Sequence, residues 1–398
     1  MAGDAGRVRG SASASRGSPA EQWAPGRLVY VDNLKVLLIA AIIAAHAVLG
    51  YAATTDAWSW SDVREVTLSA ATESVLLLTF ALTALVIPLL FLVAGLLTPR
   101  SLERKGTATY VRDRLLRLGV PFVVFALLLW PLLEYALFRT LGDAPGLWTY
   151  LRAEGTLDTG VLWFVGALLV FSLVYAGWVH LRGGRPGPAG TPPLGARHLL
   201  ALAAAVTVTT FLVRLVLPLE GDNPVVDLNL WEWPACIALF GLGVAASGQK
   251  WLTAVPDRLR RHCRTAALVA GVAIGALLVS SAVLGIDQEQ LTGGWRWPAL
   301  AFAACESAIA VFGAVWLLGV AQRHLDRRLP LVGPAARRSA YGAFMLQGPV
   351  LLGCALALRS VPLPAEVKAL LVGTAAVAGS FALAWLLIRR VPLVGRVL

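Results

Sequence analysis

Few side chains in this sequence are suited to acid–base chemistry, and His46 is the one set most deeply in an apolar stretch. It lies in the run 34–51, eleven positions after Lys35. Eleven residues make about three helical turns, so Lys35 and His46 are expected on one helix face roughly 16 Å apart. An imidazole with an ordinary pKa near 6.5 can take a proton from an attacking hydroxyl, so His46 is the candidate general base.

Both residues also have simpler interpretations. A lone His in an apolar segment is often only hydrogen-bonded to its neighbours, and a lone Lys at a helix end is ordinarily an anchor at the membrane surface. The sequence alone leaves these alternatives open.

The other polar groups in apolar runs are few, and an ionisable group inside a membrane usually faces a protein interior or a wet cavity. They are Glu73, Glu134, Arg214, Glu232 and Glu306, with Gln347 as the most polar amide of the ninth run. All except Gln347 are expected in the outer half of the membrane, which predicts one polar chamber that opens outward. Glu306 is set as deeply as His46, and we expect it to orient or charge-balance the imidazole.

Arg114 and Arg117 form the second candidate element. They lie in the polar stretch 98–119, which we predict to be a cytoplasmic loop. Residues three apart share a face of any helix that forms there, and paired arginines can grip phosphates. The stretch is therefore a candidate site for a diphosphate-bearing acyl donor. The alternative is that these arginines only set the membrane orientation and touch anionic lipid.

Composition places these residues in a membrane protein. The chain has 398 residues, of which 58% are hydrophobic and 14% charged, and its mean hydropathy is +0.72. The net charge of +11 does not indicate nucleic acid, because the basic residues are separated by apolar spans. The four cysteines include no C-x-x-C pair, so the sequence predicts neither a metal site nor a disulfide framework.

The apolar runs predict an all-α, polytopic protein of about ten transmembrane helices. The runs span residues 34–51, 74–97, 120–138, 160–180, 198–217, 231–247, 266–285, 299–320, 340–358 and 367–388. Alternation of sides places 27 of the 34 Lys and Arg residues on one face, which predicts that both termini are cytoplasmic. We expect a disordered cytoplasmic tail over 1–26, a membrane domain over 27–390 and a short cytoplasmic tail over 391–398.

Several segments resemble acyltransferase family 3, a family of multi-pass membrane O-acyltransferases. The similarity rests on residues 30–47, 95–106, 112–121 and 162–175, with weaker matches at 297–306 and 339–350. It extends over nearly all of 28–390 and is nearest to the osmoregulated-glucan succinyltransferase-like branch.

The resemblance implies a catalytic His46 preceded by the basic Lys35, and an Arg-x-x-Arg element at Arg114 and Arg117 for the donor. It also implies acetyl-CoA or succinyl-CoA as donor, a glycan or other hydroxyl acceptor, no permanently bound cofactor, and residence in the plasma membrane of a bacterium. The sequence departs from the family at Gln347, where relatives usually have a His before the helix proline; a Gln keeps a hydrogen bond but cannot take a proton.

Two further function classes remain open. A transporter would also carry ionisable residues in its helices, although it would more often show internal repeats, and none is evident here. A catalytically inactive membrane scaffold of the same family is favoured by Gln347 and disfavoured by the spacing of Lys35 and His46. The sequence reveals neither the acyl group, the acceptor nor the oligomeric state.

Overall fold

The computed structural model describes residues 28–53, 63–142, 146–153, 158–184, 193–219, 228–249, 251, 253–330 and 332–397, and this part of the chain is helical with no strand. The helices of the spanning segments are α1 (Val29–Leu49), α2 (Ala70–Lys105), α3 (Thr107–Arg114), α4 (Val120–Val124), α5 (Trp130–Leu141), α7 (Trp163–Leu181), α8 (Ala196–Arg214), α9 (Trp233–Ala246), α10 (Asp257–Leu284), α12 (Trp297–Ala308), α13 (Ala314–His324), α14 (Pro334–Leu358) and α15 (Ala365–Arg390). Outside these segments lie the short helices α6 (Leu147–Ala153), α11 (Gln288–Thr292) and α16 (Pro392–Val397).

The described residues contain ten helical segments long and apolar enough to cross a membrane. Four of them join consecutive elements. The segment from α3 to α5 is continuous, α12 continues into α13, and short 3-10 turns extend α7 and α9. The predicted all-α, ten-span architecture is confirmed. The N-terminal tail lies outside the described residues, the C-terminal tail carries α16, and the cytoplasmic placement of both termini stays a prediction.

The predicted loop over 98–119 is wrong. Helix α2 continues to Lys105 and α3 begins at Thr107, so only Gly106 interrupts the helical backbone. Arg, Lys and Glu are good helix formers, and a hydropathy pattern marks where the membrane ends rather than where a helix ends. Gly106 adopts φ 75°, a conformation open to glycine, and this residue turns the chain between the two helices.

Two π-helical turns widen the segment from α3 to α5. They cover Leu115–Gly119 and Phe125–Leu129, and a proline follows each of them by two residues, at Pro121 and Pro131. A proline has no N–H for the carbonyl four residues earlier, and its ring crowds that carbonyl. The first wide turn begins directly after Arg114 and contains Arg117.

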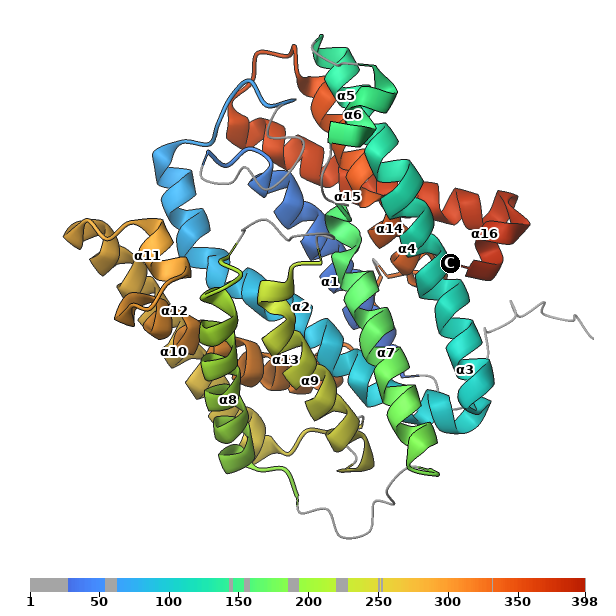
Figure 1. Cartoon of the computed structure of the whole chain (residues 1–398), viewed down its shortest axis with the longest axis vertical. Coiled ribbons are helices and arrows are strands. Elements are labelled where there is room, and N and C mark those ends of the chain that lie inside the picture. Colours follow the sequence, from blue (N-terminus) through green and yellow to red (C-terminus); the bar gives the residue numbers. More distant parts are fainter. Residues whose placement is uncertain are drawn as a thin grey trace, which may run out of the picture.

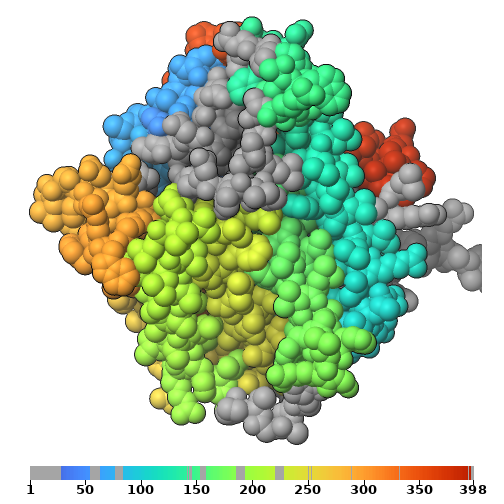
Figure 2. Space-filling view, viewed as in Figure 1, coloured from blue at the N-terminus to red at the C-terminus, as the bar shows by residue number. Residues whose placement is uncertain are grey.

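The bundle has two apolar cores that share α1, α2 and α7. Figure 1 shows these three helices in the middle of the bundle. One core lies where α2 packs along α9 and α13, and the other lies where α14 and α15 pack together against α1. Helices α7, α8 and α9 form one broad face, with the α3 to α5 segment at its edge (Figure 2). Gly95 and Gly243 allow α2 and α9 to touch, because a Cβ atom on Gly95 would lie 2.1 Å from the Phe240 carbonyl oxygen.

Candidate active site

His46 is held by an amide from a helix distant in sequence. Its Nδ1 atom on α1 lies 2.9 Å from Oε1 of Gln347 on α14. Helix α1 is continuous from Lys35 to His46, as expected, so both side chains lie close to one face of the same helix. Gln347 is fully buried, whereas His46 is half-buried.

The amide orientation decides which imidazole nitrogen carries the proton. The Nε2 group of Gln347 donates to the carbonyl of Phe344 at 3.1 Å, so its Oε1 atom faces His46 as an acceptor. Nδ1 must therefore carry the hydrogen, and the basic lone pair of the neutral ring lies on Nε2. Gln347 thus holds the neutral His46 ring with its basic lone pair on Nε2.

The indole of Trp130 packs against α14 near this pair. A Cβ atom on Gly348 would lie 2.9 Å from the ring of Trp130, so the indole closes on α14 one position after Gln347. The indole nitrogen donates to Asp158 at 2.7 Å, and the ring stacks on Phe125 at 5.5 Å. These contacts fix the indole of Trp130 against α14, next to the position of Gln347.

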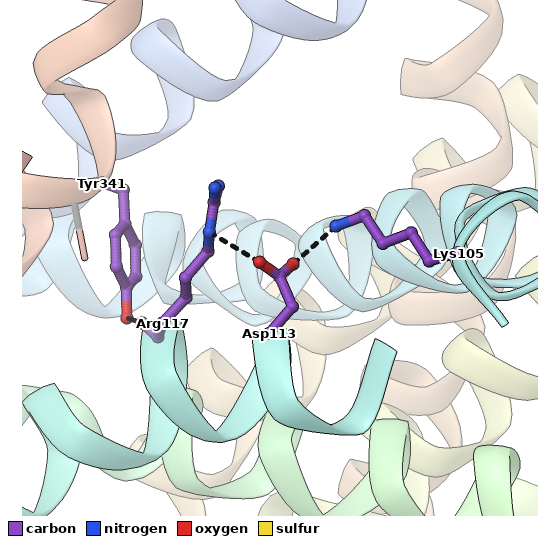
Figure 3. A network of polar contacts seen from close by, with 4 residues as sticks. All are labelled: Lys105, Asp113, Arg117 and Tyr341. Atoms are coloured by element: carbon purple, nitrogen blue, oxygen red, sulfur yellow. Dashed lines mark hydrogen bonds and ion pairs between the residues drawn. The ribbon is translucent and has the colours of Figure 1, made fainter. Parts of the chain in front are cut away.

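A basic cluster centres on the carboxylate of Asp113 in α3. Lys105 Nζ lies 2.6 Å from one carboxylate oxygen and Arg117 Nε lies 3.0 Å from the other, so the two cations approach from opposite sides (Figure 3). Arg114 also interacts electrostatically with this carboxylate, and its guanidinium lies 4.9 Å from the centre of the Tyr110 ring. Three cations therefore surround one anion, which leaves a local excess of two positive charges.

Tyr341 connects this cluster to α14. Its hydroxyl donates to the backbone carbonyl of Arg117 at 2.8 Å (Figure 3). Pro121 has no N–H to offer that carbonyl at the usual helical position, and the tyrosine hydroxyl supplies a hydrogen bond in its place. The proline-widened turn thus becomes the docking point between the basic cluster and α14.

A buried amide ties the Lys35 end of α1 to the same helix. Asn33 Nδ2 donates to the carbonyls of Leu325 and Arg327 at 2.7 and 2.8 Å, and its Oδ1 accepts from Arg337 Nε at 3.2 Å. Arg337 lies one helical turn before Tyr341 on α14. Helix α14 therefore contacts the Lys35 end of α1, the Arg117 turn and His46 in succession.

A model of the acyltransferase domain family matches residues 28–389, which include every element of this site. The chain belongs to acyltransferase family 3. Comparisons with curated proteins and with solved structures give no match. The chain is therefore a multi-pass membrane acyltransferase, and the resemblance noted in its sequence is confirmed at the level of the family.

Glu306 of this acyltransferase pairs with Arg214 and not with His46, the partner that was expected. Its carboxylate accepts hydrogen bonds from the two terminal guanidinium nitrogens of Arg214, at 2.6 and 3.1 Å. This pair links α12 to α8. Arg214 is only 5% exposed, so the pair neutralises a charge inside the bundle. The expected contact between Glu306 and His46 is absent from the described structure, because Arg214 holds Glu306 and Gln347 holds His46.

The expected single polar chamber is also divided. Arg214, Glu232 and Glu306 line one pocket beside Pro88 of α2. Glu73 instead accepts a hydrogen bond from the backbone of Ala53, and Glu134 accepts one from Tyr150 at 3.4 Å. The sequence predicted similar membrane depths for these carboxylates. Helix packing determines which of them lie in contact, and it places them at separate sites.

Sequence reasoning missed the residues that connect the site. Lys105, Asp113 and Tyr341 belong to or contact the basic cluster, and Asn33 fixes α1 from within an apolar run. One local signal was present, since Asp113 and Arg117 have the i,i+4 spacing of a helical ion pair. The pairing of Gln347 with His46 spans 301 positions and has no local signal.

Proposed function

We propose that this acyltransferase moves an acyl group of the acetyl or succinyl type from cytoplasmic acyl-CoA to a hydroxyl of a glycan or another envelope or secreted acceptor. The observation that carries the proposal is the hydrogen bond from His46 Nδ1 to Gln347 Oε1, since it directs the basic Nε2 lone pair away from the amide. The protein is expected in the plasma membrane of a bacterium.

The proposed binding site for the acyl donor is the basic cluster around Asp113. Arg114, Arg117 and Lys35, joined by Lys105, would hold the phosphates of acyl-CoA. Phosphate oxygens would take the place of the Asp113 carboxylate, which now lies between Lys105 and Arg117. Tyr341 and Gln347 are six positions apart on α14, or about 9 Å along its axis, so the pantetheine arm would pass along this helix toward His46.

The chemical step follows from the tautomer. His46 Nε2 takes the proton of the acceptor hydroxyl while the oxygen attacks the thioester carbonyl carbon. The tetrahedral intermediate then breaks its C–S bond, and the CoA thiolate leaves and takes the proton from the imidazolium. General-base assistance of this kind contributes roughly a hundred- to ten-thousand-fold in rate. Glu306 stays outside this step and neutralises Arg214.

The test compares the wild type with His46→Ala in nanodiscs. Radiolabelled acetyl-CoA and succinyl-CoA are supplied with extracted envelope glycans and lipids, and both label transfer and CoA release are measured. We expect the wild type to transfer label from one of the donors, and the variant to lose at least about a hundredfold of that rate while it still binds CoA.

The kinetic pattern separates direct attack from an acyl-His intermediate, because only the intermediate gives ping-pong kinetics with CoA released before acceptor is added. Full activity in His46→Ala would remove His46 from the mechanism. Absence of CoA binding and of turnover with either donor would contradict the acyl-CoA proposal and favour the transporter or scaffold alternative.

A further inference from the structure

Helix α10 carries a row of arginines on the face that points away from the bundle. Arg258, Arg261 and Arg264 follow one another at intervals of three positions, and all three side chains are exposed. Residues three apart share a helix face, and the row extends over about 9 Å of the helix axis. Leu259 and Cys263, which are buried, lie on the opposite face of the same turns. The three guanidiniums therefore face the surroundings of the protein.

The arginines of this row have no protein partner. In the part of the chain that the structure describes, none of the three guanidiniums pairs with a carboxylate or lies over an aromatic ring. Two other exposed arginines differ in this respect. Arg182 lies 4.7 Å from the centre of the Trp178 ring, and Arg389 lies 4.6 Å from the centre of the Trp385 ring.

The carboxylate nearest in sequence is paired with other cations. Asp257 is the one acidic residue among residues 248–265, which include five Lys or Arg residues. It pairs with Arg323 of α13 and lies 3.7 Å from Nε of Arg260. Arg260 packs against α13, because a Cβ atom on Gly319 would lie 2.7 Å from its Cδ atom. The outward row therefore keeps its positive charge.

An exposed apolar stripe continues the arginine row along the same face of α10. Leu268, Val272 and Val279 form it and are 54, 74 and 55% exposed. The stripe is about 16 Å long, close to the depth of one leaflet of a bilayer whose hydrocarbon core is about 30 Å thick. Helix α10 lies at the edge of the bundle and packs on α12 and α13 (Figure 1). A molecule along its outer face would contact three cations at one end and hydrocarbon beyond them.

This order of groups indicates the class of ligand. Guanidiniums bind phosphate oxygens through paired N–H donors, and the apolar stripe matches acyl chains. A soluble phosphate compound would use the arginines and leave the stripe unused. A zwitterionic phospholipid would bring a cation of its own to the row. The predicted topology places the row at the cytoplasmic leaflet, where a run of basic residues beside a membrane span attracts anionic lipids.

We propose that the face of α10 formed by Arg258, Arg261 and Arg264, and continued by Leu268 and Val272, binds an anionic phospholipid of the predicted cytoplasmic leaflet. The arginines hold the phosphate of the headgroup, and their long side chains reach from the helix to the headgroup plane. The inference goes beyond the proposed acyl transfer, because the lipid site uses no residue of the basic cluster around Asp113 or of the His46–Gln347 pair.

Native mass spectrometry of the full chain measures this binding. The protein is released from detergent micelles that contain equal amounts of dioleoyl phosphatidylglycerol and chain-deuterated dioleoyl phosphatidylcholine. We expect the wild type to retain phosphatidylglycerol at least about fivefold more often than phosphatidylcholine. Inorganic phosphate at about ten times the lipid concentration should not displace the lipid, since phosphate makes no contact with the apolar stripe.

Matched variants separate a site from the overall charge of the protein. The test variant combines Arg258→Gln, Arg261→Gln and Arg264→Gln, and it should lose the preference. The control makes the same change at three exposed arginines of α2, α8 and α15, which are Arg104, Arg197 and Arg390. It removes the same charge from the same predicted side and should keep the preference. Thermal unfolding in phosphatidylcholine nanodiscs checks that both variants are folded.

Three results would overturn the proposal. Equal retention of the two lipids by the wild type would mean that the row does not select a negative headgroup. An equal loss of preference in the test and control variants would mean that net charge alone attracts the lipid. Displacement of the lipid by inorganic phosphate would assign the row to a soluble phosphate compound.

Discussion

The Nδ1 atom of His46 on α1 lies 2.9 Å from Oε1 of Gln347 on α14, and the same amide donates to the Phe344 carbonyl. In the proposed mechanism, this relationship gives Gln347 a positioning role, although a Gln cannot take a proton. A Gln at this site can hold the imidazole in one tautomer without entering the proton transfer itself.

Removal of the Gln347 amide should therefore slow the chemical step and leave donor binding intact. We expect Gln347→Leu to lower kcat about tenfold, the equivalent of one lost hydrogen bond to the base, with an unchanged KM for acyl-CoA. Gln347→His, which restores a nitrogen that can bond Nδ1, should recover much of the rate. Steady-state kinetics of both variants would show this, and an equal loss in both would argue against an orienting hydrogen bond.

Asp113 should weaken donor binding, because its carboxylate pairs with Lys105 and Arg117, the cations that the donor phosphates would contact. We expect Asp113→Asn to tighten CoA binding about fivefold at low salt, on the scale of one partly exposed ion pair. Arg117→Ala should weaken binding and reduce its salt dependence. Isothermal titration with CoA measures both, and Arg112→Ala, at an exposed position in the same helix, is the control. Weaker binding in Asp113→Asn would mean that the carboxylate orients the cations for the donor.

The Arg214–Glu306 pair should matter for stability and not for chemistry. Glu306→Met alone leaves a buried guanidinium without its hydrogen-bonded carboxylate partner, which costs about 3–5 kcal/mol. The double variant Arg214→Met with Glu306→Met removes both charges and should recover most of that loss. Thermal unfolding in nanodiscs would report the stability, and label transfer would report the role. A well-folded but inactive double variant would return Glu306 to the catalytic residues.

The contact between α2 and α9 should tolerate no side chain at its closest point. Gly95→Ala would place Cβ 2.1 Å from the Phe240 carbonyl oxygen, and we expect the helices to separate at a cost of about 1–3 kcal/mol. A Cβ on Gly241 meets open space, so Gly241→Ala is the matched control and should be neutral or slightly stabilising. Equal unfolding temperatures for the two variants would contradict this close approach.

The membrane orientation also needs a direct test. Single cysteines at Arg104 and Trp295, in a background with the native cysteines replaced by Ser, lie on the predicted inner and outer sides. An impermeant maleimide applied to intact spheroplasts should label position 295 and should reach position 104 only after lysis. The reverse labelling pattern would invert the topology and place the basic cluster on the wrong side for a cytoplasmic donor.

The sequence by itself determined the class of this protein and the number of its candidate membrane-spanning segments. A membrane core requires long apolar helices whatever their neighbours are, so runs such as 34–51 and 299–320 identify spans without knowledge of packing. The same local logic put Lys35 and His46 on one helix face. It misjudged residues 98–119, because helices continue past the apolar region through residues such as Arg104 and Arg114.

Only the tertiary structure decided which polar side chains meet. Glu306 and His46 have similar expected depths in the membrane. The arrangement of the helices nevertheless pairs Glu306 with Arg214 and His46 with Gln347. A small pocket at the outer end of α1 likewise joins Tyr51 and Glu65 to Ala355 and Val372, hundreds of positions later. Spacing along one helix fixes which face a residue occupies. Its partner on another helix depends on how helices distant in sequence pack, and a local sequence pattern does not contain that information.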